Sequence, residues 1–90
     1  MPGFFDDFPL ETAQQAEAMS ALAYSLRRDR KSILDRHGVA DAEQMLAAIR
    51  AGSLPEHPAY EDYLAAAALH AAHEAARESL RILLAEAKLS

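Results

Sequence analysis

Residues 58–88 read PAYEDYLAAAALHAAHEAARESLRILLAEAK, and this stretch decides the fold. It is rich in Ala, Leu, Glu and Arg, the strongest helix formers, and has no Gly or further Pro after Pro58. Pro58 itself suits the first position of a helix, where its missing N–H costs nothing. The stretch therefore predicts one helix of about 45 Å, longer than a compact domain of 90 residues is wide.

The predicted long helix carries two interleaved rows of apolar and small residues at heptad spacing. The members are Leu69, Ala76 and Leu83 in one row, and Ala66, His73, Leu80 and Ala87 in the other. This spacing is typical of the a and d positions of a coiled coil. Small residues in both rows allow a close neighbour, either the upstream helix of the same chain or the same helix of a second copy. We favour the second copy and expect all members of both rows except Ala66 to contact it, with His73 as the polar residue that sets the register.

A helix over residues 12–37 is predicted upstream of the long helix. Thr12, followed three positions later by Gln15, is a capping-box pattern that marks a helix N-terminus. Gly38 can adopt the left-handed conformation that ends a helix. The segment 27–31 is polar on all sides, so the helix is expected to kink or to project from the core there.

A shorter helix over residues 41–51 is predicted between the other two. Asp41, with Gln44 three positions later, repeats the capping pattern, and Gly52 closes the element. The expected fold is therefore all-α and forms a single helical domain over residues 1–90. Its three helices are predicted at about 12–37, 41–51 and 58–88.

The apolar fraction of 51% overstates the core that this chain can build. Alanine supplies 21 of the apolar residues, and each alanine buries far less area than a leucine or a phenylalanine. A monomer that relies on so many alanines lies near the margin of stability. We therefore expect a second copy to complete the helical bundle.

Residues 1–10 form an aromatic lead segment that contains Phe4, Phe5 and Phe8. These rings either fold back as a lid over the core or form an exposed peptide that docks on another protein. The lead has no basic start and no uninterrupted apolar run, so it is not a secretory signal. The chain has no cysteine and no stretch of roughly 20 apolar residues, so a cytoplasmic location away from membranes is expected.

The formal net charge of −5 argues against general nucleic-acid binding, which depends on Lys and Arg side chains. Basic residues nevertheless concentrate in the segment 27–36. The candidate contacts for nucleic acid or an acidic partner are Arg27, Arg28, Arg30 and Lys31. Cations spread over several faces of a helix are more typical of a solvated stripe. The predicted helix 41–51 offers only Gln44 and Arg50 for reading bases.

His70, His73 and Glu74 are the one group that suggests chemistry. Imidazoles three residues apart are neighbours on a helix surface, and such pairs can bind zinc with a carboxylate or water. The spacing is not that of a zinc protease, and structural roles for both histidines are favoured over a metal site. No catalytic residue and no cofactor are predicted.

These patterns predict a non-enzymatic helical interaction protein that forms a homodimer through its C-terminal helix and binds a larger protein partner. One alternative is a small antitoxin-like or DNA-binding regulator that uses the segment 27–36. A second alternative is a helical metal-binding protein that uses His70 and His73. The sequence leaves open whether the paired helices run parallel or antiparallel.

Overall fold

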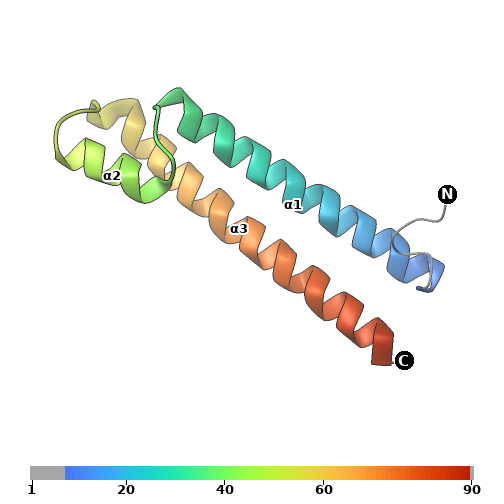
Figure 1. Ribbon diagram of the computed structural model, residues 1–90. Coiled ribbons are helices and arrows are strands. Elements are labelled where there is room, and N and C mark those ends of the chain that lie inside the picture. The colour runs from blue at the N-terminus through green and yellow to red at the C-terminus, as the bar shows by residue number, and fades with distance from the viewer. Residues whose placement is uncertain (1–7, 90) are drawn as a thin grey trace.

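The computed structural model describes residues 8–89, which form three α-helices and contain no strand (Figure 1). The helices are α1 (Leu10–Arg36), α2 (Ala42–Arg50) and α3 (Glu56–Leu89). The all-α fold and all three helices are therefore confirmed, with ends that differ from the prediction by one or two residues.

The start of α1 differs from the prediction. Pro9 precedes the helix, no side chain caps it, and Thr12 lies inside the first turn. The prediction that Thr12 and Gln15 form a capping box at the start of this helix is therefore wrong. Leu10 and Glu11 are themselves good helix formers, and Pro9, with φ at −53°, already directs the chain into the helix in front of them.

The predicted aromatic lead is described only in part. Leu10 belongs to α1, so the lead ends at Pro9. Phe4 and Phe5 lie outside the described residues, and neither the lid nor the docking peptide is tested for them. Phe8 is half-buried.

The starts of α2 and α3 follow the predicted pattern. The Oδ1 atom of Asp41 accepts a hydrogen bond from the backbone N–H of Gln44 at 2.8 Å, and the Gln44 side chain accepts one from Ala40 N–H at 3.0 Å. His57 has extended backbone angles (φ −114°, ψ 130°), so regular helix begins at Pro58.

Both turns between helices depend on a glycine with positive φ. Gly38 (φ 65°) follows α1 and Gly52 (φ 80°) follows α2, as predicted. After α1, the N–H of Val39 donates to the carbonyl of Leu34 at 3.2 Å, and α2 ends with the same arrangement. This is the Schellman motif, whose left-handed residue is usually glycine because other side chains are strained there.

α1 and α3 run antiparallel and side by side, and α2 packs on α3 at the end of the hairpin where the chain turns back (Figure 1). α1 is unbroken through the segment 27–31 and Leu34 beyond it is buried, so the expected kink or projection is wrong. The molecule measures 54 × 25 × 15 Å. Since a helix with its side chains is about 10–12 Å across, the smallest dimension is little more than one layer of helices.

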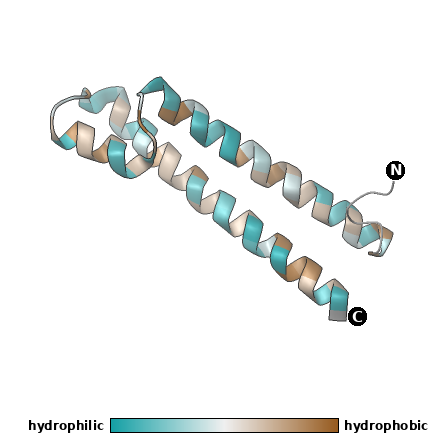
Figure 2. Ribbon diagram, in the orientation of Figure 1, coloured by the Kyte–Doolittle hydropathy of each residue, from teal (hydrophilic) through white to brown (hydrophobic). Residues whose placement is uncertain are grey.

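The core of this layer is thin. Among the described residues six apolar side chains are buried, and four of these are alanines: Ala16, Ala59, Ala66 and Ala76. The other two are Leu34 and Met45, which pack with Ala66 into one cluster. Figure 2 shows that hydrophobic residues recur along the full length of α1 and α3, so apolar surface continues well beyond this cluster.

One half-buried pair joins the end of α1 to the start of α3. His37 Nε2 lies 2.8 Å from Asp62 Oδ2, and the two side chains are 14% and 22% exposed. Arg36 approaches the same carboxylate at 3.9 Å. The pair fixes the register of the hairpin, because it holds the last turn of α1 opposite an early turn of α3.

Asp62→Ala is expected to lower the free energy of unfolding by about 1–2 kcal/mol, since it leaves a half-buried imidazole without its hydrogen-bond partner. Urea unfolding followed by circular dichroism at 222 nm measures this loss. Glu61→Ala is the control, because Glu61 is exposed and contacts the exposed His57. It should change stability far less, and equal losses in the two variants would contradict a special role for the His37 pair.

Candidate interaction surfaces

The two rows of α3 that were predicted to contact a second copy face α1 of the same chain. We call these two rows together the seam. Ala76 is buried, and the other members are half-buried: Leu69, His73, Leu80, Leu83 and Ala87. Most contacts of α3 are with α1, so this burial arises within one chain. The structure thus places α1 where we expected another copy, and a contact between copies through the seam stays a prediction.

An apolar groove of about 520 Å³ runs between the N-terminal half of α1 and the C-terminal half of α3. Its lining consists of Gln15, Ala18, Met19, Leu22, Ser79, Ile82, Leu83 and Glu86. Leu22 and Ile82 are 49% and 42% exposed, although both are large and apolar. Leu83 is the member of the seam that reaches this groove. The groove therefore leaves apolar side chains of both long helices open to a partner.

A row of small exposed residues extends the groove along α3. Ser79 and Ile82 line the groove, and side chains three and four positions apart share one side of a helix. The full row is Ala65, Ala68, Ala72, Ala75, Ser79 and Ile82, all exposed and all uncharged. We call this row, together with Ala18 and Leu22 of α1, the smooth face.

In the described part of the chain, no helix combines the length and the apolar character needed to cross a membrane.

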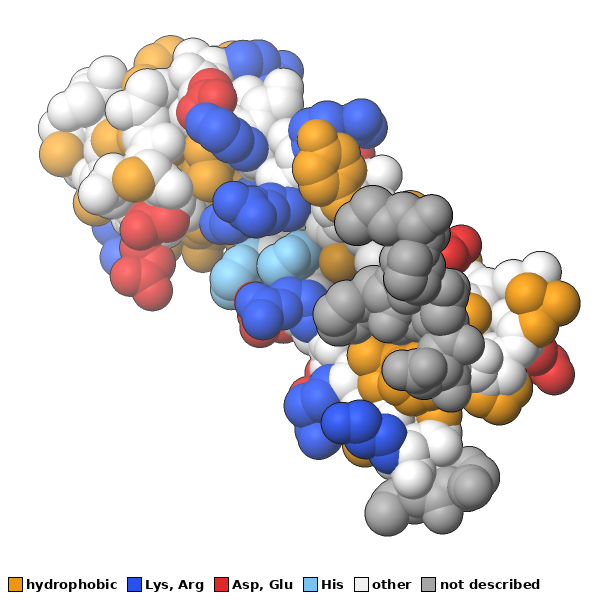
Figure 3. Space-filling view, turned by 45° about the vertical axis from the view of Figure 1, so that its right-hand side comes forward, with side chains coloured by type: hydrophobic (Ala, Val, Ile, Leu, Met, Phe, Trp, Pro, Cys, Tyr) orange, Lys and Arg blue, Asp and Glu red, His pale blue; other side chains and the backbone are white. Residues whose placement is uncertain are grey.

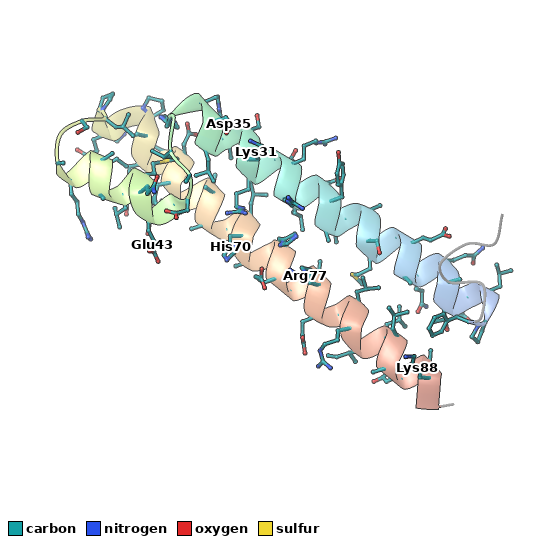
Figure 4. The ribbon with its side chains drawn as sticks, viewed as in Figure 1. Lys31, Asp35, Glu43, His70, Arg77 and Lys88 are labelled. Carbon is teal, nitrogen blue, oxygen red and sulfur yellow. The ribbon has the colours of Figure 1, made fainter. Side chains whose placement is uncertain are left out.

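The other side of α3 faces α2 and is charged. Tyr63 and His70 line a cleft of about 560 Å³ together with residues of α2. The same helical spacing continues from His70 to Glu74, Arg77, Arg81 and Lys88. Figure 4 shows the labelled His70 and Arg77 on this stretch of α3. The two sides of α3 therefore differ sharply in charge.

Arg81 and Glu78 form a tight exposed pair on α3. Arg81 donates to both carboxylate oxygens of Glu78, at 2.6 and 3.0 Å. The hydrogen bond lowers the pKa of Glu78 and raises the pKa of Arg81, so both groups stay charged over a wider pH range. Arg81 is thus already supplied with a carboxylate.

The four predicted basic contacts do not act as one group. Arg28 and Lys31 each pair with an aspartate of α1, at 3.4 and 3.0 Å, and Figure 4 shows Lys31 beside Asp35. Arg27 is exposed and Arg30 is half-buried, and neither has an ion pair within residues 8–89. The segment 27–31 is thus divided between two paired and two unpaired cations.

His70, His73 and Glu74 do not assemble a metal site. His73 is nearly covered in the seam, with its Nδ1 atom 3.6 Å from a Glu74 oxygen, whereas His70 is exposed. Across the described residues, no group of three His, Asp or Glu side chains is placed to hold a metal ion. The metal-binding alternative therefore lacks a third ligand there.

α2 carries few groups that could read DNA bases. The Gln44 side chain is engaged at the N-terminus of its own helix, which leaves Arg50 in the cleft between α2 and α3. A recognition helix needs several exposed Arg, Lys, Asn or Gln side chains. The structure therefore adds no support to the DNA-binding alternative.

A model of one protein family spans nearly the whole of this three-helix unit. The family is described as the Uncharacterized protein MJ0235 family, and the match covers residues 14–88. The chain belongs to the MJ0235 family. Neither the curated proteins nor the solved structures gave a match to it.

The MJ0235 family match includes all of α2 and almost all of α1 and α3. It therefore contains both the smooth face and the charged side of the hairpin. The family description names no activity.

Sequence reasoning missed Leu22 and Ile82 as parts of a second apolar surface on this member of the MJ0235 family. A signal was present, because a second row at spacings of three and four residues flanks the predicted seam on α3. The pairing of His37 with Asp62 was also missed. It joins residues far apart in the chain, and no local pattern marks such a contact.

Proposed function

We propose that this MJ0235 family protein is a non-enzymatic, cytoplasmic interaction module that forms a homodimer and binds a larger protein partner. The observation that carries the proposal is the thin single layer of α1 and α3 with an apolar groove open on one face. A hairpin of this kind is half of a four-helix bundle. A second copy supplies the other half.

The surface area of the chain supports this proposal. Its accessible surface is 6388 Å², whereas a compact monomer of its mass has about 5,200 Å². The radius of gyration, 17.4 Å, also exceeds the value of about 12 Å for a compact chain of this length. The surplus area of about 1,200 Å² exceeds the area of about 800 Å² that each partner buries in a standard interface.

The proposed dimer packs smooth face against smooth face. Alanines along α3 allow two helices to approach closely, and Leu22 and Ile82 of each copy enter the groove of the other. The uncharged row avoids the large free-energy cost of burying unpaired charges. The charged side with α2 then faces outward, where it is available to the larger partner.

Sedimentation equilibrium on the full chain over about 1–100 μM tests the homodimer. The expected mass is twice the 9.8 kDa of one chain. The expected dissociation constant is about 1 μM or tighter, as for interfaces of standard size. A mass of one chain at every concentration would refute the homodimer.

A further inference from the structure

Three of the arginines without an ion pair among the described residues lie at the middle of the hairpin. Arg27 and Arg30 on α1 and Arg77 on α3 have no such pair among the residues that the structure describes. Arg28, Lys31, Arg36 and Arg81 of the long helices each lie within 4 Å of a carboxylate, whereas Lys88, near the C-terminal end of α3, has no ion pair among the described residues. The chain has 14 acidic and nine basic residues, so a shortage of carboxylates does not explain why these arginines have no ion pair.

The register of the hairpin brings these arginines beside two histidines. Counting equally back along α1 and forward along α3 from the pair of His37 and Asp62 places Arg30 opposite Leu69 and Arg27 opposite Ala72. His70 and His73 flank those positions. Arg30 and His70 line the same cleft, and Figure 3 shows histidines beside Lys and Arg side chains at the middle of the molecule.

Arg77 belongs to the same side of α3 as His70, because the two lie two turns apart. We call Arg27, Arg30, His70, His73 and Arg77 the waist patch. Glu74 is the one acidic residue of α3 between positions 64 and 77, and Asp29 is the one acid of α1 between 23 and 34. Asp29 pairs with Arg28, so the waist patch is predominantly positive.

Arg30 gives the patch an unsatisfied group. Its Nε atom is buried and has no hydrogen-bond partner. A buried polar group without a partner destabilises the state that contains it, and a cation in a partly closed site is stabilised by a nearby anion. Arg30 also lines a cavity of about 250 Å³ with Arg27, Lys31 and Asp35. Because Lys31 pairs with Asp35, the two arginines are left for an anion that enters the cavity.

We propose that the waist patch binds a short acidic peptide segment of a partner protein through its aspartate or glutamate carboxylates. This inference rests on the proposed function, because it identifies where the larger partner contacts the chain. Guanidinium groups match carboxylates in paired hydrogen bonds, and three arginines on two adjacent helices suit a few neighbouring carboxylates. The exposed Tyr24, one turn before Arg27, offers apolar contact beside them.

A nucleic acid is the poorer fit for this patch. Asp35 lines the same cavity as Arg27 and Arg30, where it pairs with Lys31, and Asp41 and Glu43 line the same cleft as Arg30 and His70. An extended chain of phosphates would pass all three carboxylates. The whole chain has a net charge of −5, which repels an extended polyanion. A short peptide brings fewer negative charges close to those carboxylates than an extended polyanion does.

Fluorescence anisotropy of a labelled hexaglutamate peptide, titrated with the full chain at about 50 mM salt, tests the site. Arg27→Gln and Arg28→Gln are the matched pair, because both residues are exposed, adjacent in sequence and equal in charge change. Arg27→Gln is expected to weaken binding about tenfold and Arg28→Gln less than about twofold. Arg30→Gln should weaken it at least as much as Arg27→Gln.

Three results would overturn the proposal. They are no binding of hexaglutamate to the wild-type chain, equal weakening by Arg27→Gln and Arg28→Gln, and tighter binding of an oligothymidylate of equal charge. Sedimentation of the same samples separates this inference from the homodimer. A single-chain mass with intact peptide binding refutes only the dimer, whereas a dimer that ignores the peptide refutes only the waist patch.

Discussion

Ala72→Glu is expected to convert the homodimer into single chains. Ala72 is exposed at the centre of the smooth face, and a two-fold interface buries the new carboxylate twice. Burying this charge on both copies costs several kcal/mol, so the dimer affinity should fall by at least about 100-fold. Sedimentation equilibrium at about 10 μM then reports a single-chain mass in place of the dimer.

Ala71→Glu is the matched control for this prediction. Ala71 is also exposed, and the substitution is the same and lies in the same helix. Its side chain, however, points away from both α1 and the smooth face. Its dimer affinity should stay within about threefold of the wild type. Monomers in both variants would indicate general charge repulsion, and dimers in both would exclude the smooth face as the interface.

The positions of the helices were readable from the sequence because their determinants are local. Pro58 and the unbroken run of helix formers after it predicted α3, and Asp41 with Gln44 predicted the start of α2. Gly38 and Gly52 predicted both turns, since a positive φ is a property of single residues. Only the start of α1 was wrong, where Pro9 and Leu10 outweighed the pattern at Thr12.

The partner of the predicted seam was not readable from the sequence. Heptad spacing at positions such as Ala76 and Leu83 shows that a row is covered, but it does not show which helix covers it. The matching row of α1 is interrupted by Arg30 between Leu26 and Ile33, which weakens its heptad pattern. The pattern therefore suggested another copy, although the half-buried seam lies against α1.

The candidate sites depended even more on contacts between distant segments. Arg27 and Arg28 look alike in the sequence, and only the fold separates the unpaired cation from the one beside Asp29. His70 and His73 suggested a metal because their spacing is local. Their proximity to Arg30, on which the waist patch depends, requires the register of the hairpin.

A thin core makes stability depend on very few side chains. Leu34 and Met45 are the only large apolar residues that are buried in the described part of the chain, and of the two only Met45 is fully buried. Met45 is 0% exposed and packs with Leu34 and Ala66, and through it α2 is attached to the hairpin. α2 packs mainly on α3, so it has little other attachment.

Met45→Ala is therefore expected to cost about 2–4 kcal/mol of unfolding free energy, the range for emptying a fully buried site. A domain of this size has about 5–13 kcal/mol in total, so the urea midpoint should fall by about 2 M. α2 is expected to detach first, with α1 and α3 still helical. Circular dichroism at 222 nm and a fixed protein concentration follow the transition.

Leu46→Ala is the control, because Leu46 is the next residue of the same helix but is only half-buried at the cleft. The helix propensity of alanine is retained in both variants, so any difference between them reports burial. Leu46→Ala should cost about 1 kcal/mol, in proportion to its smaller buried area. Equal losses would mean that α2 is held by its whole surface, and that Met45 is not the residue on which its attachment depends.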